Sequence, residues 1–304
     1  MKNSYFDLIE QSYYFPQEGF DLRRNSLTFH GISLKYLIKK YGTPFRFIYL
    51  PKIGEQIRRA RNLFNKAIKK NNYQGKYFYC YCTKCNHFSH VVNEALKHNV
   101  NLETSSSYDI DLILHLFKDK KIDKKRMIIH NGYKTREYMT KIIELQRMGF
   151  NNNIIVLDSM NELARLKELA KGDKLKIGIR MAINEESQSS YYTSRLGIRH
   201  TQILDFFNRE IKGKTNIELK MLHFFVDTGI KDSLYFWGEF QKALKLYIDL
   251  KKQCPTLDSF NLGGGFPIRN HLGFEYNYEY MINEIVSNIK AACAVENLPD
   301  PDIY

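Results

Sequence analysis

The pattern of apolar and polar positions along the chain predicts a repeated strand–helix unit. Short runs rich in aromatic and β-branched residues alternate with longer segments in which apolar residues recur every three or four positions. The runs predicted as strands are residues 45–49, 77–84, 101–105, 127–131, 154–158, 176–182, 219–226 and 260–262. The segments predicted as helices between and after them are residues 53–71, 90–98, 108–118, 135–148, 160–170, 201–209, 234–252 and 278–292.

This order predicts an α/β fold with a parallel sheet, because each helix carries the chain back to the edge at which the previous strand began. A doubly wound sheet and a closed (β/α)8 TIM-type barrel both fit, and seven or eight units in about 260 residues favour the barrel. We expect residues 1–43 to form an N-terminal preface, with a strand at 26–29 and a helix from about Leu34. Residues 44–304 are expected to form the barrel. Ser159 and Glu162 have the spacing of a capping box at the start of helix 160–170.

Composition narrows the class of protein only slightly. The 304 residues are 43% hydrophobic, enough for a large core, and contain no apolar run that could span a bilayer. An acidic residue lies where a signal peptide would have its apolar segment, so we expect a cytoplasmic protein without a membrane partner. The net charge of +13 raises nucleic acid as a partner. However, the densest basic run, residues 58–70, lies on the polar side of an amphipathic helix, so we expect no nucleic-acid partner.

Lys84 is the first candidate for chemistry. It ends the aromatic strand 77–84, and residues two apart on a strand share a face, so Cys80, Cys82 and Lys84 are expected to point the same way. At the mouth of a barrel, a lysine amine can condense with an aldehyde as a Schiff base. The alternative interpretation is a lysine that closes the strand and reaches into water.

Gly263, Gly264 and Gly265 directly follow the predicted strand 260–262. Three glycines let the main chain approach an anion closely, and loops after the late strands of a barrel often bind phosphate. A tight exit from the strand is the alternative. Arg180 ends another strand and would need an anion, either Glu103 or a ligand, if it were buried. A Schiff-base lysine and a phosphate-binding loop at one barrel mouth together indicate pyridoxal phosphate as cofactor.

Other polar residues admit different interpretations. Cys82, Cys85, His87 and His90 could form a zinc site, but the spacing lacks the long loop that lets four ligands converge, so we expect no metal. Cys82 and Cys85 could form a redox pair, although no helix is predicted to begin at the first cysteine. The five cysteines otherwise indicate free thiols.

His223 shares a strand face with Phe225 and is interpreted as a core residue, with contact to a planar ligand as the alternative.

Several short motifs in a fixed order then identify a family. They are Tyr41-Gly-Thr-Pro44, Tyr81-Cys-Thr-Lys-Cys-Asn86, Leu102-Glu-Thr-Ser-Ser-Ser107, His130-Asn-Gly-Tyr-Lys134, Ser194-Arg-Leu-Gly197, residues 222–229 and Leu262-Gly-Gly-Gly-Phe266. In these motifs the chain resembles the barrel-type pyridoxal-phosphate decarboxylases that act on ornithine, diaminopimelate and arginine. The likeness is greatest to the biosynthetic arginine decarboxylase branch.

The resemblance implies a role for each candidate residue. Lys84 would bind the cofactor aldehyde, and Gly263, Gly264 and Gly265 would hold its phosphate. Glu103 would be the acid near that lysine, Arg180 the strand-end arginine, and Thr228 a hydroxyl near the phosphate. Phe225 takes the place of the histidine that usually stacks on the cofactor ring, so it can stack but supplies no proton.

The implied reaction is decarboxylation of a basic amino acid, most simply arginine to agmatine in polyamine biosynthesis, by an enzyme that is a homodimer at full length. The alternatives are a non-catalytic remnant that still binds pyridoxal phosphate, or a decarboxylase for diaminopimelate or carboxynorspermidine. The family continues with a Glu-x-Gly-Arg strand and a C-terminal β domain. We therefore expect a barrel incomplete at its C-terminal end, with seven strands counted from that of Lys84 and unpaired edges, no β domain, and no decarboxylation by this chain alone.

Overall fold

The computed structural model describes residues 19–183, 196–226, 233–268 and 275–304. The chain divides into two compact units. The smaller unit comprises Met1–Tyr49 and Phe266–Asn277, and the larger comprises Leu50–Gly265 and Tyr278–Tyr304.

The smaller unit contains a three-stranded antiparallel sheet followed by a helix. The strands are β1 (Phe20–Arg23), β2 (Ser26–Phe29) and β3 (Ile32–Ser33), and the helix is α1 (Leu34–Tyr41). Ser33 caps the helix by accepting a hydrogen bond from the Tyr36 amide at 3.4 Å, and Gly42 ends it with a φ of +78°.

The prediction of a strand at residues 45–49 is wrong, because this segment is irregular. Its aromatic residues instead pack on β2: the ring of Phe47 lies 4.8 Å and that of Tyr49 5.6 Å from the ring of Phe29. The aromatic content that favours a strand therefore serves side-chain packing here.

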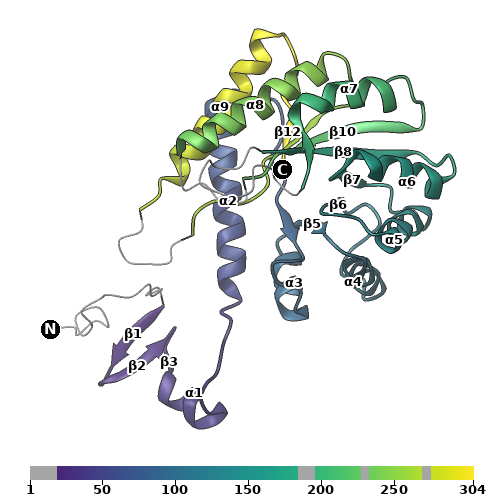
Figure 1. The fold of residues 1–304 in the computed structure, drawn as a ribbon. Coiled ribbons are helices and arrows are strands. Elements are labelled where there is room, and N and C mark those ends of the chain that lie inside the picture. Colours follow the sequence, from purple (N-terminus) through teal and green to yellow (C-terminus); the bar gives the residue numbers. More distant parts are fainter. Residues whose placement is uncertain (1–18, 184–195, 227–232, 269–274) are drawn as a thin grey trace, which may run out of the picture. The chain divides into compact units, whose positions relative to one another are not determined.

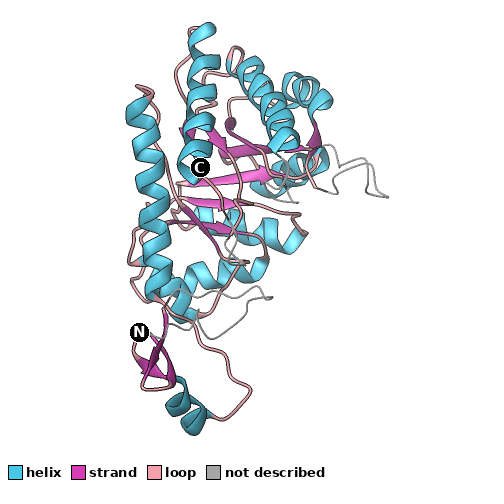
Figure 2. Ribbon diagram, turned by 90° about the vertical axis from the view of Figure 1, so that its left-hand side faces the viewer, coloured by secondary structure: helices cyan, strands magenta, loops and turns pink. Residues whose placement is uncertain are grey.

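The larger unit is built on a parallel sheet in the order β12-β11-β10-β8-β7-β6-β5-β4, with the short strand β9 pairing with β8. The strands are β4 (Cys80–Cys82), β5 (Asn101–Thr104), β6 (Ile128–His130), β7 (Asn153–Leu157), β8 (Leu175–Ala182), β9 (Ile198–Arg199), β10 (Ile217–His223), β11 (Ser259–Asn261) and β12 (Asp302–Ile303). Figures 1 and 2 show the sheet curled, with helices along its outer side. The predicted TIM-type barrel, incomplete at its C-terminal end, is confirmed.

All predicted helices of this unit form, with bounds that shift by a few residues. They are α2 (Pro51–Lys70), α3 (Ser89–Leu96), α4 (Ser107–Lys118), α5 (Arg136–Arg147), α6 (Met160–Ala170), α7 (His200–Glu210), α8 (Ser233–Lys251) and α9 (Tyr278–Val295). Ser106 and Thr135 cap α4 and α5 through their side-chain oxygens. Among the described residues, no helix is long and apolar enough to cross a membrane.

Apolar residues fill both faces of the sheet. Ile129, Ile154, Val156 and Met221 form a buried cluster against which Cys80 packs. Tyr79, just before β4, and Tyr81, within it, pack on the other side against residues of α2 and α3. The predicted alternation is therefore present at residues 79–81, with both tyrosines directed toward the helices.

The last strand, β12, joins the two edges of the sheet. Asp302 and Ile303 pair with β11 in parallel, and Ile303 also forms a parallel bridge with Tyr77, just before β4. The amide of Phe78 donates to Ile303 O at 2.8 Å, and the amide of Ile303 donates to Lys76 O at 2.7 Å. The expectation of seven strands with unpaired edges therefore needs correction. An eighth strand, β12, is two residues long, pairs with β11 at one edge and bridges to Tyr77 at the other.

Candidate functional site

Lys84 lies just beyond β4, at the carboxyl edge of the sheet. The strand ends at Cys82, earlier than predicted, and residues 83–85 form a turn in which the Cys85 amide donates to Cys82 O at 3.1 Å. The Lys84 side chain is therefore exposed on a turn, and strand alternation does not set its direction. Its charge nevertheless acts on the ends of other strands. It opposes the rise that burial causes in the pKa of Asp158, after β7, and it adds to the fall that burial causes in the pKa of His223, at the end of β10.

Glu103, on β5, connects three neighbouring strand ends. Its Oε1 accepts a hydrogen bond from Cys82 Sγ at 3.3 Å and another from Asn131 Nδ2 at 3.2 Å. Its main-chain oxygen accepts from the amide of Thr83 at 2.9 Å, which fixes the start of the turn that carries Lys84. The Glu103 side chain is thus held in place by Cys82, at the end of β4, and Asn131, after β6.

Arg180, on β8, is buried with only 7% of its surface exposed. Its Nη1 lies 3.6 Å from Asp158 Oδ1, and its guanidinium lies 5.6 Å from the centre of the Phe225 ring. Neither carboxylate oxygen of Asp158 accepts a hydrogen bond from any residue that the structure describes. Burial raises the pKa of Asp158, against the effects of Lys134, Arg180 and Lys84. Such a poorly satisfied buried ion pair has hydrogen-bonding capacity left for a ligand.

A second lysine near this edge, Lys134, is buried, and the sequence alone assigned it no role. Lys134 Nζ donates to Gly132 O at 2.8 Å and to Val156 O, and it pairs with Glu162 Oε2 at 3.2 Å. Glu162 also accepts from the amides of Lys134 at 3.0 Å and of Asp158 at 2.9 Å. Burial lowers the pKa of Lys134, and Glu162 opposes that effect.

The predicted capping box is consequently wrong in its partners. Ser159 makes no side-chain capping bond at the start of α6, and Glu162 reaches the loops after β6 and β7 instead of the helix N-terminus. Local spacing predicted a helix start correctly. The carboxylate of Glu162 instead pairs with Lys134, which lies 28 positions earlier, so a local sequence pattern could not predict the pair.

Burial disfavours the charged form of two histidines, His130 and His223. His130 shares a hydrogen bond between Nδ1 and Thr104 Oγ1 at 2.8 Å, and burial together with Lys134 lowers its pKa to about 3. His223 is 2% exposed, as expected of a core residue, and burial together with nearby cations holds its pKa well below the usual value.

The glycine loop adjoins the ring of Phe225. Gly263 has a φ of +67°, and a Cβ there would lie 2.8 Å from both Phe224 O and the Phe225 ring. Gly263 therefore permits a close approach between the ends of β10 and β11. At Gly264, by contrast, a Cβ would meet no described atom within 4 Å. Thr228 and Ser194 lie outside the described residues.

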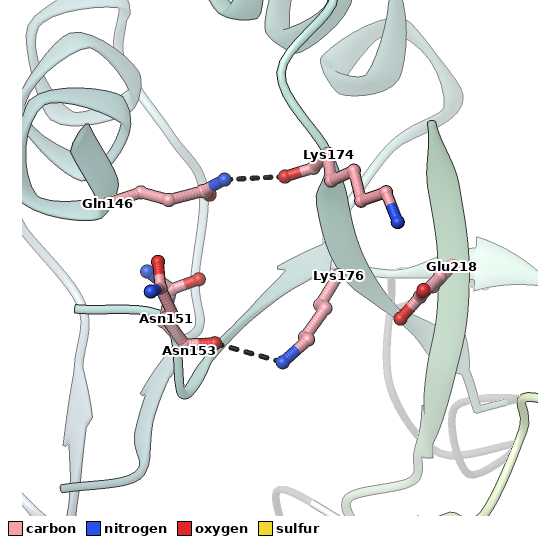
Figure 3. A pocket seen from close by; sticks show the side chains of 6 residues that line it. All are labelled: Gln146, Asn151, Asn153, Lys174, Lys176 and Glu218. Carbon is pink, nitrogen blue, oxygen red and sulfur yellow. Dashed lines mark hydrogen bonds between the residues drawn. The ribbon is translucent and has the colours of Figure 1, made fainter. Parts of the chain in front are cut away.

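A small cavity of about 180 Å³ lies elsewhere, lined by Gln146, Asn151, Asn153, Lys174, Lys176 and Glu218 (Figure 3). Its lining residues lie at the amino ends of β7, β8 and β10, just before β7 and β8, and, for Gln146, in the last turn of α5. In a parallel barrel this is the edge opposite that of Lys84, the edge where conserved chemistry is uncommon. No cluster of His, Cys, Asp and Glu suited to a metal ion occurs within the described part of the chain.

Comparison with known proteins matches residues 53–304 to the family model described as "Pyridoxal-dependent decarboxylase, pyridoxal binding domain". A biosynthetic arginine decarboxylase of Prochlorococcus marinus (strain MIT 9515) is 25% identical over 284 residues, which cover 87% of this chain and 43% of that protein. The chain thus spans less than half the length of this relative.

Solved structures share the fold. The biosynthetic arginine decarboxylase of Campylobacter jejuni has a TM-score of 0.74 at 22% identity, covering 94% of this chain and 49% of that one. Diaminopimelate decarboxylase of M. jannaschii, in complex with L-lysine, has a TM-score of 0.75 at 17% identity, covering 94% of this chain and 65% of that one.

Proposed function

The chain belongs to the family of pyridoxal-dependent decarboxylases through their pyridoxal-binding domain, and on this premise we propose that it is the cofactor-binding part of an arginine decarboxylase. Its cofactor is pyridoxal phosphate. The proposal of arginine rests on the relatives named biosynthetic arginine decarboxylase, which match most of this chain at about a quarter identity.

The observation that carries the proposed site is the grouping of Arg180, Phe225 and Gly263 at three strand ends. The guanidinium lies 5.6 Å from the ring, and a Cβ on Gly263 would lie 2.8 Å from it. A cation, a flat aromatic face and an open glycine loop are the features that a phosphorylated planar ligand requires. The carboxylate of Asp158 pairs with Arg180 but accepts no hydrogen bond from the described residues, which supports a site that a polar ligand completes.

Each residue has a proposed task. Lys84 supplies the amine that holds the cofactor aldehyde, and Gly263, Gly264, Gly265 and Thr228 hold the phosphate. Phe225 stacks on the ring without exchanging a proton, and Arg180 supplies positive charge at the ring edge. Glu103, fixed by Cys82 and Asn131, supplies a carboxylate near Lys84.

When bound, pyridoxal phosphate supplies a ring that accepts the electron pair left behind as carbon dioxide departs from the amino acid. The chain's own residues orient that ring. Asp158 keeps Arg180 in position from one side, while the buried pair of Lys134 and Glu162 fixes the main chain at Asp158.

The direct test is to incubate the purified chain with pyridoxal phosphate, reduce with borohydride and map the labelled residue. We expect the label on Lys84, with its loss in Lys84→Ala. Lys97→Ala is the matched control, because Lys97 is an exposed lysine that follows α3 and its ion pair, with Glu94, is local. Labelling spread over exposed lysines, unchanged in Lys84→Ala, would contradict the assignment.

The substrate is tested by competition in the same assay. An amino acid that binds at the cofactor displaces Lys84 and protects it from borohydride labelling. We expect arginine to protect Lys84 at lower concentration than diaminopimelate, ornithine or lysine. If diaminopimelate protected Lys84 more strongly, it would replace arginine as the proposed substrate, and the cofactor assignment would be unaffected.

A further inference from the structure

The turn that carries Lys84 has a cysteine at each end. Cys82 and Cys85 are its first and fourth residues, and the amide of Cys85 donates to Cys82 O at 3.1 Å. In a hydrogen-bonded turn of this kind the first and fourth Cα atoms lie within about 7 Å. Disulfides need a Cα separation of about 4.4–6.8 Å, so this turn brings the two cysteines close to the separations at which a disulfide can form.

The two thiols differ in their surroundings. Cys85 is exposed, whereas Cys82 is half-buried and donates its S–H to Glu103 Oε1 at 3.3 Å. Burial and the charge of Glu103 raise the pKa of Cys82, which disfavours its thiolate. The exposed Cys85 is therefore the thiol that a dissolved oxidant reaches first.

The other cysteines are poorly placed to compete. Cys254 and Cys293 are buried, and Cys80 packs against the apolar cluster around Ile129. Cys80 also lies only two residues from Cys82 on an extended strand, where both side chains share a face.

We propose that Cys82 and Cys85 form a reversible disulfide across the turn that carries Lys84. The oxidant is a small-molecule disulfide of the glutathione class. The Cys85 thiolate attacks one sulfur of that disulfide and releases one thiol. The Cys82 thiol then loses its proton to solvent and attacks Cys85 Sγ, which releases the second thiol. Two protein thiols are oxidised and one external disulfide is reduced to two thiols.

The bond changes the surroundings of Lys84, the third residue of the turn. It removes the S–H donor that Cys82 offers to Glu103 and leaves Asn131 as the remaining side-chain donor to that carboxylate among the described residues. It also closes a small ring around the Lys84 backbone. Under the proposed function, the oxidised chain therefore reacts with pyridoxal phosphate several-fold more slowly than the reduced chain.

The test equilibrates the full chain in oxidised glutathione, alkylates the remaining thiols and digests with trypsin. Cleavage after Lys84 separates Cys82 from Cys85, so the disulfide appears as two linked peptides, residues 77–84 and 85–97. We expect this linked pair in the wild type and in the control Cys80→Ala, its disappearance with dithiothreitol, and its absence in Cys82→Ser and Cys85→Ser. A stable glutathione adduct on Cys85 without the linked pair, or a linked pair lost in Cys80→Ala, would overturn the proposal.

Borohydride labelling of Lys84 in the reduced and oxidised chains measures the consequence. We expect slower labelling after oxidation, with recovery in dithiothreitol. Equal rates would overturn the proposed effect of the disulfide on Lys84. The cofactor assignment and the disulfide can also fail independently of each other. An unlabelled Lys84 in the reduced chain contradicts the cofactor assignment, whereas a missing peptide link with normal labelling contradicts only the disulfide.

Discussion

The guanidinium of Arg180 lies 5.6 Å from the centre of the Phe225 ring. This contact explains why a phenyl ring suits this position. A protonated imidazole beside a buried arginine would meet like charge, whereas the face of a phenyl ring attracts the cation. Phe225 thus stabilises Arg180 and still offers a flat surface to a cofactor ring.

Replacing Phe225 with leucine should weaken pyridoxal phosphate binding several-fold, because aromatic stacking contributes about 0.5–1.5 kcal/mol. Phe225→Tyr retains the ring and should bind nearly as well as the wild type. The dissociation constant of the cofactor, measured by titration, is the readout. Equal affinities in the leucine and wild-type chains would show that Phe225 does not contact the cofactor.

Replacing Lys134 with methionine should lower the free energy of unfolding by about 3–5 kcal/mol, because Glu162 would remain as a buried unpaired carboxylate. In the double variant Lys134→Met/Glu162→Gln the loss should be smaller, since the charge is gone and the amide oxygen still accepts from Asp158. Urea denaturation of both variants measures the difference. A double variant less stable than the single one would mean that the charge on Glu162 is not what destabilises Lys134→Met.

Gly263→Ala should destabilise the chain by about 1–3 kcal/mol, because an alanine would combine a left-handed φ with a Cβ 2.8 Å from Phe224 O and the Phe225 ring. Gly264→Ala is the matched control. Its Cβ would meet no described atom within 4 Å, so its midpoint of urea denaturation should stay within error of the wild type. Equal effects of the two substitutions would contradict the close approach seen at Gly263.

Acid should destabilise the fold through its buried neutral histidines. The pKa of His130 is about 3 in the folded chain and about 6.5 when unfolded, so below pH 6.5 the unfolded state binds the additional proton. The stability present above pH 6.5 is therefore lost as the pH falls, by up to about 1.4 kcal/mol per pH unit from this residue. His223 acts in the same direction.

Urea denaturation between pH 7 and pH 5 checks this dependence. His130→Asn should give a shallower loss of stability per pH unit than the wild type. His90→Asn, at an exposed position, should keep the wild-type slope. Identical slopes in all three chains would exclude His130 as a source of the acid sensitivity.

The sequence by itself determined the alternation of strands and helices and the order in which candidate residues meet the carboxyl edge. Periodicity is a local property, so it predicts the helix at residues 135–148, which forms as α5, and the glycines after strand 260–262 are evident in the sequence without knowledge of the fold. The same local signals misjudged residues 45–49, whose aromatic rings pack on Phe29 without forming a strand.

Only the tertiary structure decided which residues pair across the sheet. Glu162 binds Lys134, 28 positions away, although its spacing from Ser159 is that of a capping box. Ile303 bridges β11 and Tyr77, which lie far apart in sequence, and Lys84 sits on a turn because β4 ends at Cys82. These outcomes depend on which strand ends the curvature of the sheet brings together. A local pattern cannot predict them, because the residues that meet are far apart in the sequence.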